Sequence, residues 1–72
     1  MPLTPQQRLT MIQQAQNTLQ NARHQAERNL QQQLSNARTD AQVANAHRNY
    51  NAALNRATNR YNNSITQINN MP

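Results

Sequence analysis

The side chains that could do chemistry in this 72-residue chain are few and far apart. The sequence contains one Glu, one Asp, two His, two Ser and no Cys. Catalysis needs several such groups that converge in a concave, partly dry site. His24 and His47 are 23 positions apart, which is about 35 Å along a continuous helix, so one chain would not bring them to the same metal ion. We therefore expect no enzymatic activity, no metal site and no cofactor.

Two residue types could still act if several copies of the chain come together. Copies of His47 would then lie close to one another, where stacked imidazoles could bind a metal or respond to pH. The simpler interpretation of His47 is a tolerated polar layer or a surface position. Tyr50 and Tyr61 fit large packing contacts, whereas stacking on nucleic-acid bases would require exposed rings. Glu27 follows Arg23 by four residues, the spacing of an ordinary ion pair on a helix surface.

Arginine dominates the charge of the chain. Seven Arg, no Lys and two acidic residues give a net charge of +5, and arginine favours bidentate pairing with carboxylate or phosphate. The arginines are spread along the chain rather than concentrated at one end, unlike the basic region of a DNA-reading zipper. They could meet phosphate nonspecifically, an acidic protein surface or only water, and a GC-rich genome would give the same bias. The candidate polyanion contacts are Arg23, Arg28, Arg38, Arg48, Arg56 and Arg60.

The element that must position these residues is predicted to be helical. Between positions 6 and 71 the sequence has no Gly and no Pro, the two residues that most often end a helix. Thr4-Pro5-Gln6-Gln7 is a capping box with Pro at the first helical position. Leu3 stands where a hydrophobic staple residue belongs, and the expected staple partner position is occupied by Arg8. The helix should therefore begin at Pro5.

A stripe of apolar residues follows this helix. It runs from Ile12 to Ile68 in sixteen steps over 56 residues, a mean spacing of 3.5 residues, and every member except His47 is apolar or Tyr. A 3.5-residue repeat is typical of a left-handed coiled coil. In the centre of the chain the stripe passes through Ala41, Ala44 and His47, where its spacing is irregular. The residues expected to carry helix packing are Ile12, Leu19, Leu30, Leu34, Leu54, Tyr61 and Ile68.

The predicted fold is all-α, with a single long, coiled-coil-like helix over residues 5–70, roughly 100 Å in length. Cap-forming residues mark two places where this helix could break. The first is 35–40, where Ser35-Asn36 and Thr39-Asp40 would allow a helical hairpin instead, although the absence of Gly and Pro favours the continuous form. The second is 62–64. The expected organisation is an N-terminal extension and cap (1–4), an amphipathic helix (5–61), and a re-capped or frayed helical turn (62–72).

The chain is poor in the residues that build a hydrophobic core. It has six Leu, three Ile, one Val, three Met and two Tyr, with no Phe or Trp, while ten Ala make up the rest of the apolar residues. Short chains usually compensate for a small core with disulfides, metals or oligomerisation, and a chain without Cys cannot form disulfides. We therefore expect a homo-oligomer or docking within a larger protein assembly.

The functional hypothesis from the sequence is a non-enzymatic structural subunit. It would pack with copies of itself or inside a larger particle, for example a virion or an injection-type machine. The alternative is a basic helix that associates nonspecifically with nucleic acid. No apolar run of about 18 residues predicts a membrane span, and no secretion signal is recognisable, so the expected location is the cytoplasm or an assembled particle. Twenty-five of the 72 residues are Gln or Asn, whose neutral amides would let helices pack closely without charge repulsion.

Overall fold

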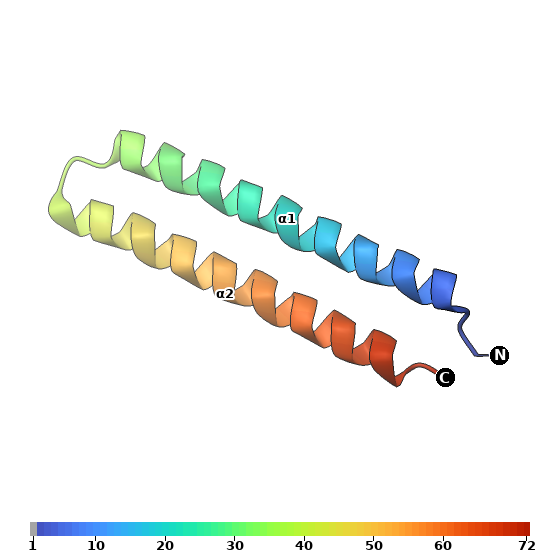
Figure 1. The fold of residues 1–72 in the computed structure, drawn as a ribbon. Coiled ribbons are helices and arrows are strands. Elements are labelled where there is room, and N and C mark those ends of the chain that lie inside the picture. The colour runs from blue at the N-terminus through green and yellow to red at the C-terminus, as the bar shows by residue number, and fades with distance from the viewer. Residues whose placement is uncertain (1) are drawn as a thin grey trace.

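The computed structural model describes residues 2–72 and shows a helical hairpin (Figure 1). Helix α1 spans Pro5–Asn36 and helix α2 spans Asp40–Asn70. The two helices lie side by side and antiparallel, with both termini at one end and the connection at the other. The predicted all-α fold and the break predicted near residues 35–40 are confirmed, in the hairpin form of that fold. The molecule is accordingly 56 Å long, about half the length of the continuous helix that the absence of Gly and Pro had favoured.

The turn between the helices is made without Gly and without positive backbone φ angles among the described residues. Ala37 and Thr39 both take extended conformations, with φ/ψ of −73°/133° and −132°/158°. The Thr39 side chain caps α2 by accepting a 3.2 Å hydrogen bond from the Gln42 amide. The Gln42 side chain in turn accepts a 2.6 Å hydrogen bond from the Arg38 amide. Because the chain reverses through extended residues, this turn needs no left-handed residue, and side chains bond two of its free backbone amides. The absence of Gly therefore did not exclude a hairpin.

The start of α1 is the capping box predicted from the sequence. The Thr4 hydroxyl accepts a 3.1 Å hydrogen bond from the Gln7 amide, and the Gln7 side chain accepts a 3.0 Å bond from the Thr4 amide. Pro5 occupies the first helical position, where its missing N–H costs nothing. The prediction that the helix begins at Pro5 is confirmed.

Helix α2 runs through residues 62–64 without a break. The Thr66 hydroxyl, just after the break predicted at 62–64, donates a 2.9 Å hydrogen bond to the Asn62 carbonyl oxygen one turn earlier. A hydroxyl bonded in this way is compatible with a helix interior and does not start a new helix. Ser64 is half-buried, as expected for a residue between the two helices.

The core between the helices is very small. Four residues of the described chain are buried, namely Ala26, Ala46, Ala57 and Ile68. Three of them are alanines, whose methyl groups remove little apolar area from water. Small side chains let the two helix backbones approach closely, but they leave most of the larger apolar side chains at the margin of the contact.

The buried positions in α2 differ from the apolar stripe expected in the centre of the chain. Ala41, Ala44 and His47 are exposed, whereas Ala46 is only 1% exposed. The reason is the turn at residues 37–39, because a helix that restarts after a turn presents its own face to its partner. The stripe in α2 therefore passes through Ala46, and His47 is a surface residue.

Candidate interaction surfaces

The free end of the hairpin is closed by Arg8, which is half-buried. Its guanidinium donates hydrogen bonds to the carbonyl oxygens of Ile68, at 2.9 Å, and Met71, at 3.1 Å. The amide of Leu3 donates a further bond of 2.7 Å to the carbonyl oxygen of Pro72. These carbonyls belong to the last turn of α2 and beyond, where the regular helical bonding pattern ends, and the Ile68 carbonyl also accepts a 3.3 Å bond from the Met71 amide. Arg8 thus caps α2 from the opposite helix.

The role of Arg8 was missed by the sequence analysis, although a signal was present. Arg8 occupies the position where the staple partner of Leu3 was expected, and it lies four residues before Ile12 at the start of the apolar stripe. A lone cation on an apolar stripe at a helix end is a candidate to bond carbonyls of a neighbouring helix terminus. The helix that receives it could be identified only from the hairpin.

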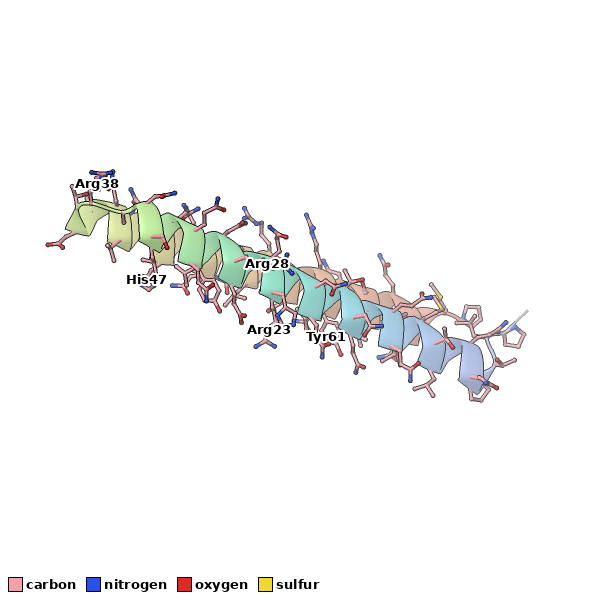
Figure 2. All side chains as sticks on the ribbon, turned by 90° about the horizontal axis from the view of Figure 1, so that it is seen from above. Arg23, Arg28, Arg38, His47 and Tyr61 are labelled. Carbon is pink, nitrogen blue, oxygen red and sulfur yellow. The ribbon has the colours of Figure 1, made fainter. Side chains whose placement is uncertain are left out.

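One long side of the hairpin carries the larger apolar residues. Figure 2 shows Arg23, His47 and Tyr61 pointing to the same side of the molecule. Leu30 follows Arg23 by seven residues, and Leu54 follows His47 by seven, so both leucines lie on this side. By the same spacing rule this surface, which we call the leucine face, consists of Leu9, Ile12, Leu30, Leu34, Val43, Leu54, Tyr61 and Ile65.

The leucine face is incompletely covered. Leu9 is 53% exposed and Val43 is 37% exposed, while the other six members are half-buried. Five of the seven residues predicted to carry helix packing belong to this face. Of the remaining two, Leu19 is half-buried and Ile68 is buried. In the described chain the two elements in contact are α1 and α2 of the same hairpin.

The six arginines predicted as polyanion contacts are all exposed but do not form one patch. Arg28 and Arg48 each follow a buried alanine by two residues, which turns them about 200° around the helix and away from the partner helix. Arg38 lies in the turn, and Arg23 borders the leucine face (Figure 2). The remaining two, Arg56 and Arg60, lie one turn apart on α2.

Arg56 and Arg60 border a groove between the two helices, on the side of α2 that faces away from Leu54. Arg56 follows Leu54 by two residues, which places it about 200° around α2. The groove has a volume of about 280 Å³ and continues into a second section of about 270 Å³. Both sections are lined by Ala26, Asn29, Ala53 and Arg56. We call this surface the alanine groove; its other lining residues include Ala15, Thr18, Ala22, Gln25, Gln33, Asn49, Ala57, Arg60 and Ser64, together with Leu30 and Tyr61 at the edge of the leucine face.

Polar side chains form the α1 rim of the alanine groove. The Gln25 amide group donates a 3.2 Å hydrogen bond to the Asn29 side chain, and both residues are exposed. Toward the turn, the Asn49 side chain donates a 3.3 Å hydrogen bond to the Gln33 side chain on the opposite helix. Amides therefore line one rim and cross one end of the groove, whereas guanidinium groups line the other rim.

No family model, curated protein sequence or solved structure matches the chain. The candidate sites are therefore the leucine face, the alanine groove and the Arg8 cap, each defined by geometry alone.

The titratable groups considered in the sequence analysis lie apart from these surfaces or at their edges. The ion pair predicted between Arg23 and Glu27 is replaced by one between His24 Nδ1 and Glu27 Oε2, at 3.9 Å, which exists only when His24 is protonated. Both side chains are more than half exposed. Within residues 2–72, no group of three or more metal-ligating side chains lies close enough to hold an ion. Neither helix has an apolar segment long enough to cross a membrane.

Proposed function

We propose that this protein is a non-enzymatic structural subunit whose hairpins pack against one another through the leucine face. The single observation that supports this most directly is the contrast in burial. Three of the four buried residues are alanines, whereas none of the six leucines is buried. The residues best suited to form a core thus remain partly in water, where a second copy of the chain can cover them.

The free energy gained by covering the leucine face is substantial for a chain of this size. Each leucine that passes from half-buried to buried contributes of the order of 1 kcal/mol. The hairpin measures 56 Å by 15 Å across its two longest dimensions. The area of one such side is of the same order as the roughly 800 Å² that each partner buries in a standard interface. A helical hairpin that pairs through one face would complete a four-helix bundle.

The surface of the hairpin is compatible with such packing. The exposed positions are dominated by Asn and Gln, which are neutral and offer both a donor and an acceptor. A net charge of +5 leaves weak repulsion between copies, which salt screens. The same properties suit a subunit within a larger particle such as a virion or an injection-type machine, which we retain as the setting of the proposed function.

Sedimentation velocity over a range of concentrations tests this proposal. We expect wild-type chain to sediment as a multiple of 8.3 kDa at tens of micromolar and to dissociate on dilution. The double variant Leu9→Gln/Val43→Gln should shift the dissociation to at least tenfold higher concentration, because these are the exposed large apolar residues of the described chain.

The matched control is Ala41→Gln/Ala44→Gln, since both alanines are exposed on α2 away from the core. This control should associate like wild type. A folded wild-type monomer at every concentration, or equal effects of the two double variants, would rule out the leucine face as the interface.

The alternative function, nonspecific association with nucleic acid, is supported by the exposure of six arginines. It predicts binding that is indifferent to sequence and that weakens steeply with salt. Because Arg28 and Arg48 project away from the hairpin axis while Arg56 and Arg60 border the groove, a duplex on one side would meet only part of the set. Absence of retention on DNA or RNA at about 50 mM salt would remove this alternative.

A further inference from the structure

The alanine groove differs from the leucine face in shape and in charge. Its floor includes Ala26 and Ala57, which are 4% and 8% exposed, together with Ala53. Leu19 and Tyr61 also contribute to its lining. Small side chains along a trough between two helices allow a third helix to approach closely, because helix axes pack 8–10 Å apart depending on the side chains at the contact.

The groove is long enough for such a helix. Its lining extends from Ala15 to Gln33 on α1 and from Ser64 to Ala46 on α2. Eighteen residues of helix span about 27 Å, which corresponds to about five turns of an occupant helix. The Asn49–Gln33 hydrogen bond crosses the end nearer the turn.

The charge of the α2 rim indicates the chemistry of the occupant. Arg56 and Arg60 lie four residues apart, so their Cβ atoms are about 6 Å from each other on the same side of α2. The ion pair found within residues 2–72 joins His24 to Glu27 and leaves both of these guanidinium groups without a carboxylate. Arginine pairs most strongly with carboxylates that it can meet through two parallel hydrogen bonds.

A second copy of this chain is poorly suited to fill the groove. It has one Glu and one Asp against seven Arg, and Glu27 and Asp40 are thirteen residues apart rather than one turn apart. Copies that met groove to groove would bring Arg56 and Arg60 toward each other. The occupant that complements the rim must therefore come from a different, acidic protein.

We propose that the alanine groove docks an acidic amphipathic helix of a partner protein. The occupant places small or apolar side chains on the alanine floor and carboxylates, spaced one turn apart, against Arg56 and Arg60. The amides of Gln25 and Asn29 on the opposite rim bond its polar side chains. The groove shares Leu30 and Tyr61 with the edge of the leucine face, whereas its alanine floor and its arginine rim lie outside that face.

The test uses the full chain labelled with ¹⁵N and two synthetic peptides as probes. The first is a capped 21-residue helix of Ala, Leu and Gln with Glu at two positions one turn apart, and the second carries Lys at those two positions. We expect the Glu peptide to shift the amide resonances of groove residues such as Ala22, Ala26 and Ala53, and the Lys peptide to bind at least tenfold more weakly.

Two double variants separate the groove from general charge. Arg56→Gln/Arg60→Gln should weaken binding of the Glu peptide at least tenfold, whereas Arg28→Gln/Arg48→Gln removes the same charge from the outer surfaces and should leave binding nearly unchanged. A third variant, Ala22→Leu, fills the groove from an exposed position without changing charge, and should also abolish binding. Circular dichroism of each variant confirms that the hairpin remains folded.

Several results would overturn the proposal. These are no binding of the Glu peptide, equal losses in the two arginine variants, or resonance shifts confined to the leucine face. A single-stranded DNA oligonucleotide that binds more tightly than the Glu peptide and depends on Arg56 and Arg60 would assign the groove to a polyanion instead. Sedimentation of Arg56→Gln/Arg60→Gln should match wild type, so failure of this inference is distinguishable from failure of self-association.

Discussion

Arg8 donates a 2.9 Å hydrogen bond to the carbonyl oxygen of Ile68, 60 residues later in the chain. Ile68 is one of the four buried residues, and Arg8 is itself half-buried beside it. The contact joins the first turns of α1 to the last turn of α2. It places a positive charge at the negative end of the α2 dipole and holds the two helices together where no loop connects them.

Replacement of Arg8 by Met should therefore destabilise the open end of the hairpin. A hydrogen bond that involves a charged group contributes about 1.5–3 kcal/mol, and we expect a loss of this size in the free energy of unfolding measured with urea. Amide hydrogen exchange should become faster in the last turns of α2. The control is Arg28→Met, which removes an exposed arginine; if both variants lose the same stability, the Arg8 cap has no special role.

A second prediction tests which face of α2 meets α1. Ala46 is 1% exposed and Ala44 is exposed, so Ala46→Leu should overpack the contact and cost about 1–3 kcal/mol. Ala44→Leu should change the free energy of unfolding by less than about 0.5 kcal/mol. If Ala44→Leu were the more damaging substitution, α2 would present the face that the continuous apolar stripe had indicated.

A third prediction concerns the turn. Thr39 caps α2 through its 3.2 Å bond from the Gln42 amide, and Thr39→Ala should cost about 1 kcal/mol. Hydrogen exchange at Gln42 and Val43 should accelerate, since their amides bond the Thr39 side chain and carbonyl. Thr58→Ala, at an exposed position within α2, serves as the control and should be neutral or stabilising by a few tenths of a kcal/mol. Unchanged exchange at both amides in Thr39→Ala would show that this cap does not hold the turn.

The sequence predicted much of this fold because local signals determine helix starts. Thr4 and Gln7 formed the expected capping box, and Thr39 was among the residues that marked the break. Whether the chain turns there depends on which has the lower free energy, one continuous helix or two shorter helices in contact. That difference is set by tertiary packing and not by local sequence. The burial of Ala46 is also a tertiary effect, because the turn sets which face of α2 is rotated toward α1.

The candidate surfaces were less predictable than the fold. Arg8, Arg56 and Arg60 are chemically alike and lie on the same type of helix, yet one bonds carbonyls of the opposite helix and two border a groove. Only the pairing of α1 with α2 separates these roles. The leucine face could be anticipated as a set of packing residues, but its incomplete coverage could not, because burial depends on how close the alanines bring the helices.

A fourth prediction concerns Tyr61, which belongs to the leucine face and is half-buried. In a Tyr50→Phe variant, Tyr61 is the single tyrosine, and acrylamide should quench its fluorescence less as the protein concentration rises. The reason is that association of leucine faces covers the ring. Addition of Leu9→Gln and Val43→Gln should move this change to higher concentration. Quenching that stays constant from 1 to about 200 μM would contradict burial of Tyr61 between chains.

The concentration dependence of the melting temperature tests the central proposal most directly. The core of the hairpin consists of three alanines and one isoleucine, and under the proposed function association stabilises it, so folding and association should be coupled. Circular dichroism at 222 nm should show a melting temperature that rises by several degrees between about 2 and 200 μM chain. A melting temperature that stays the same over this range, with full helicity at the lowest concentration, would show that the hairpin is stable alone.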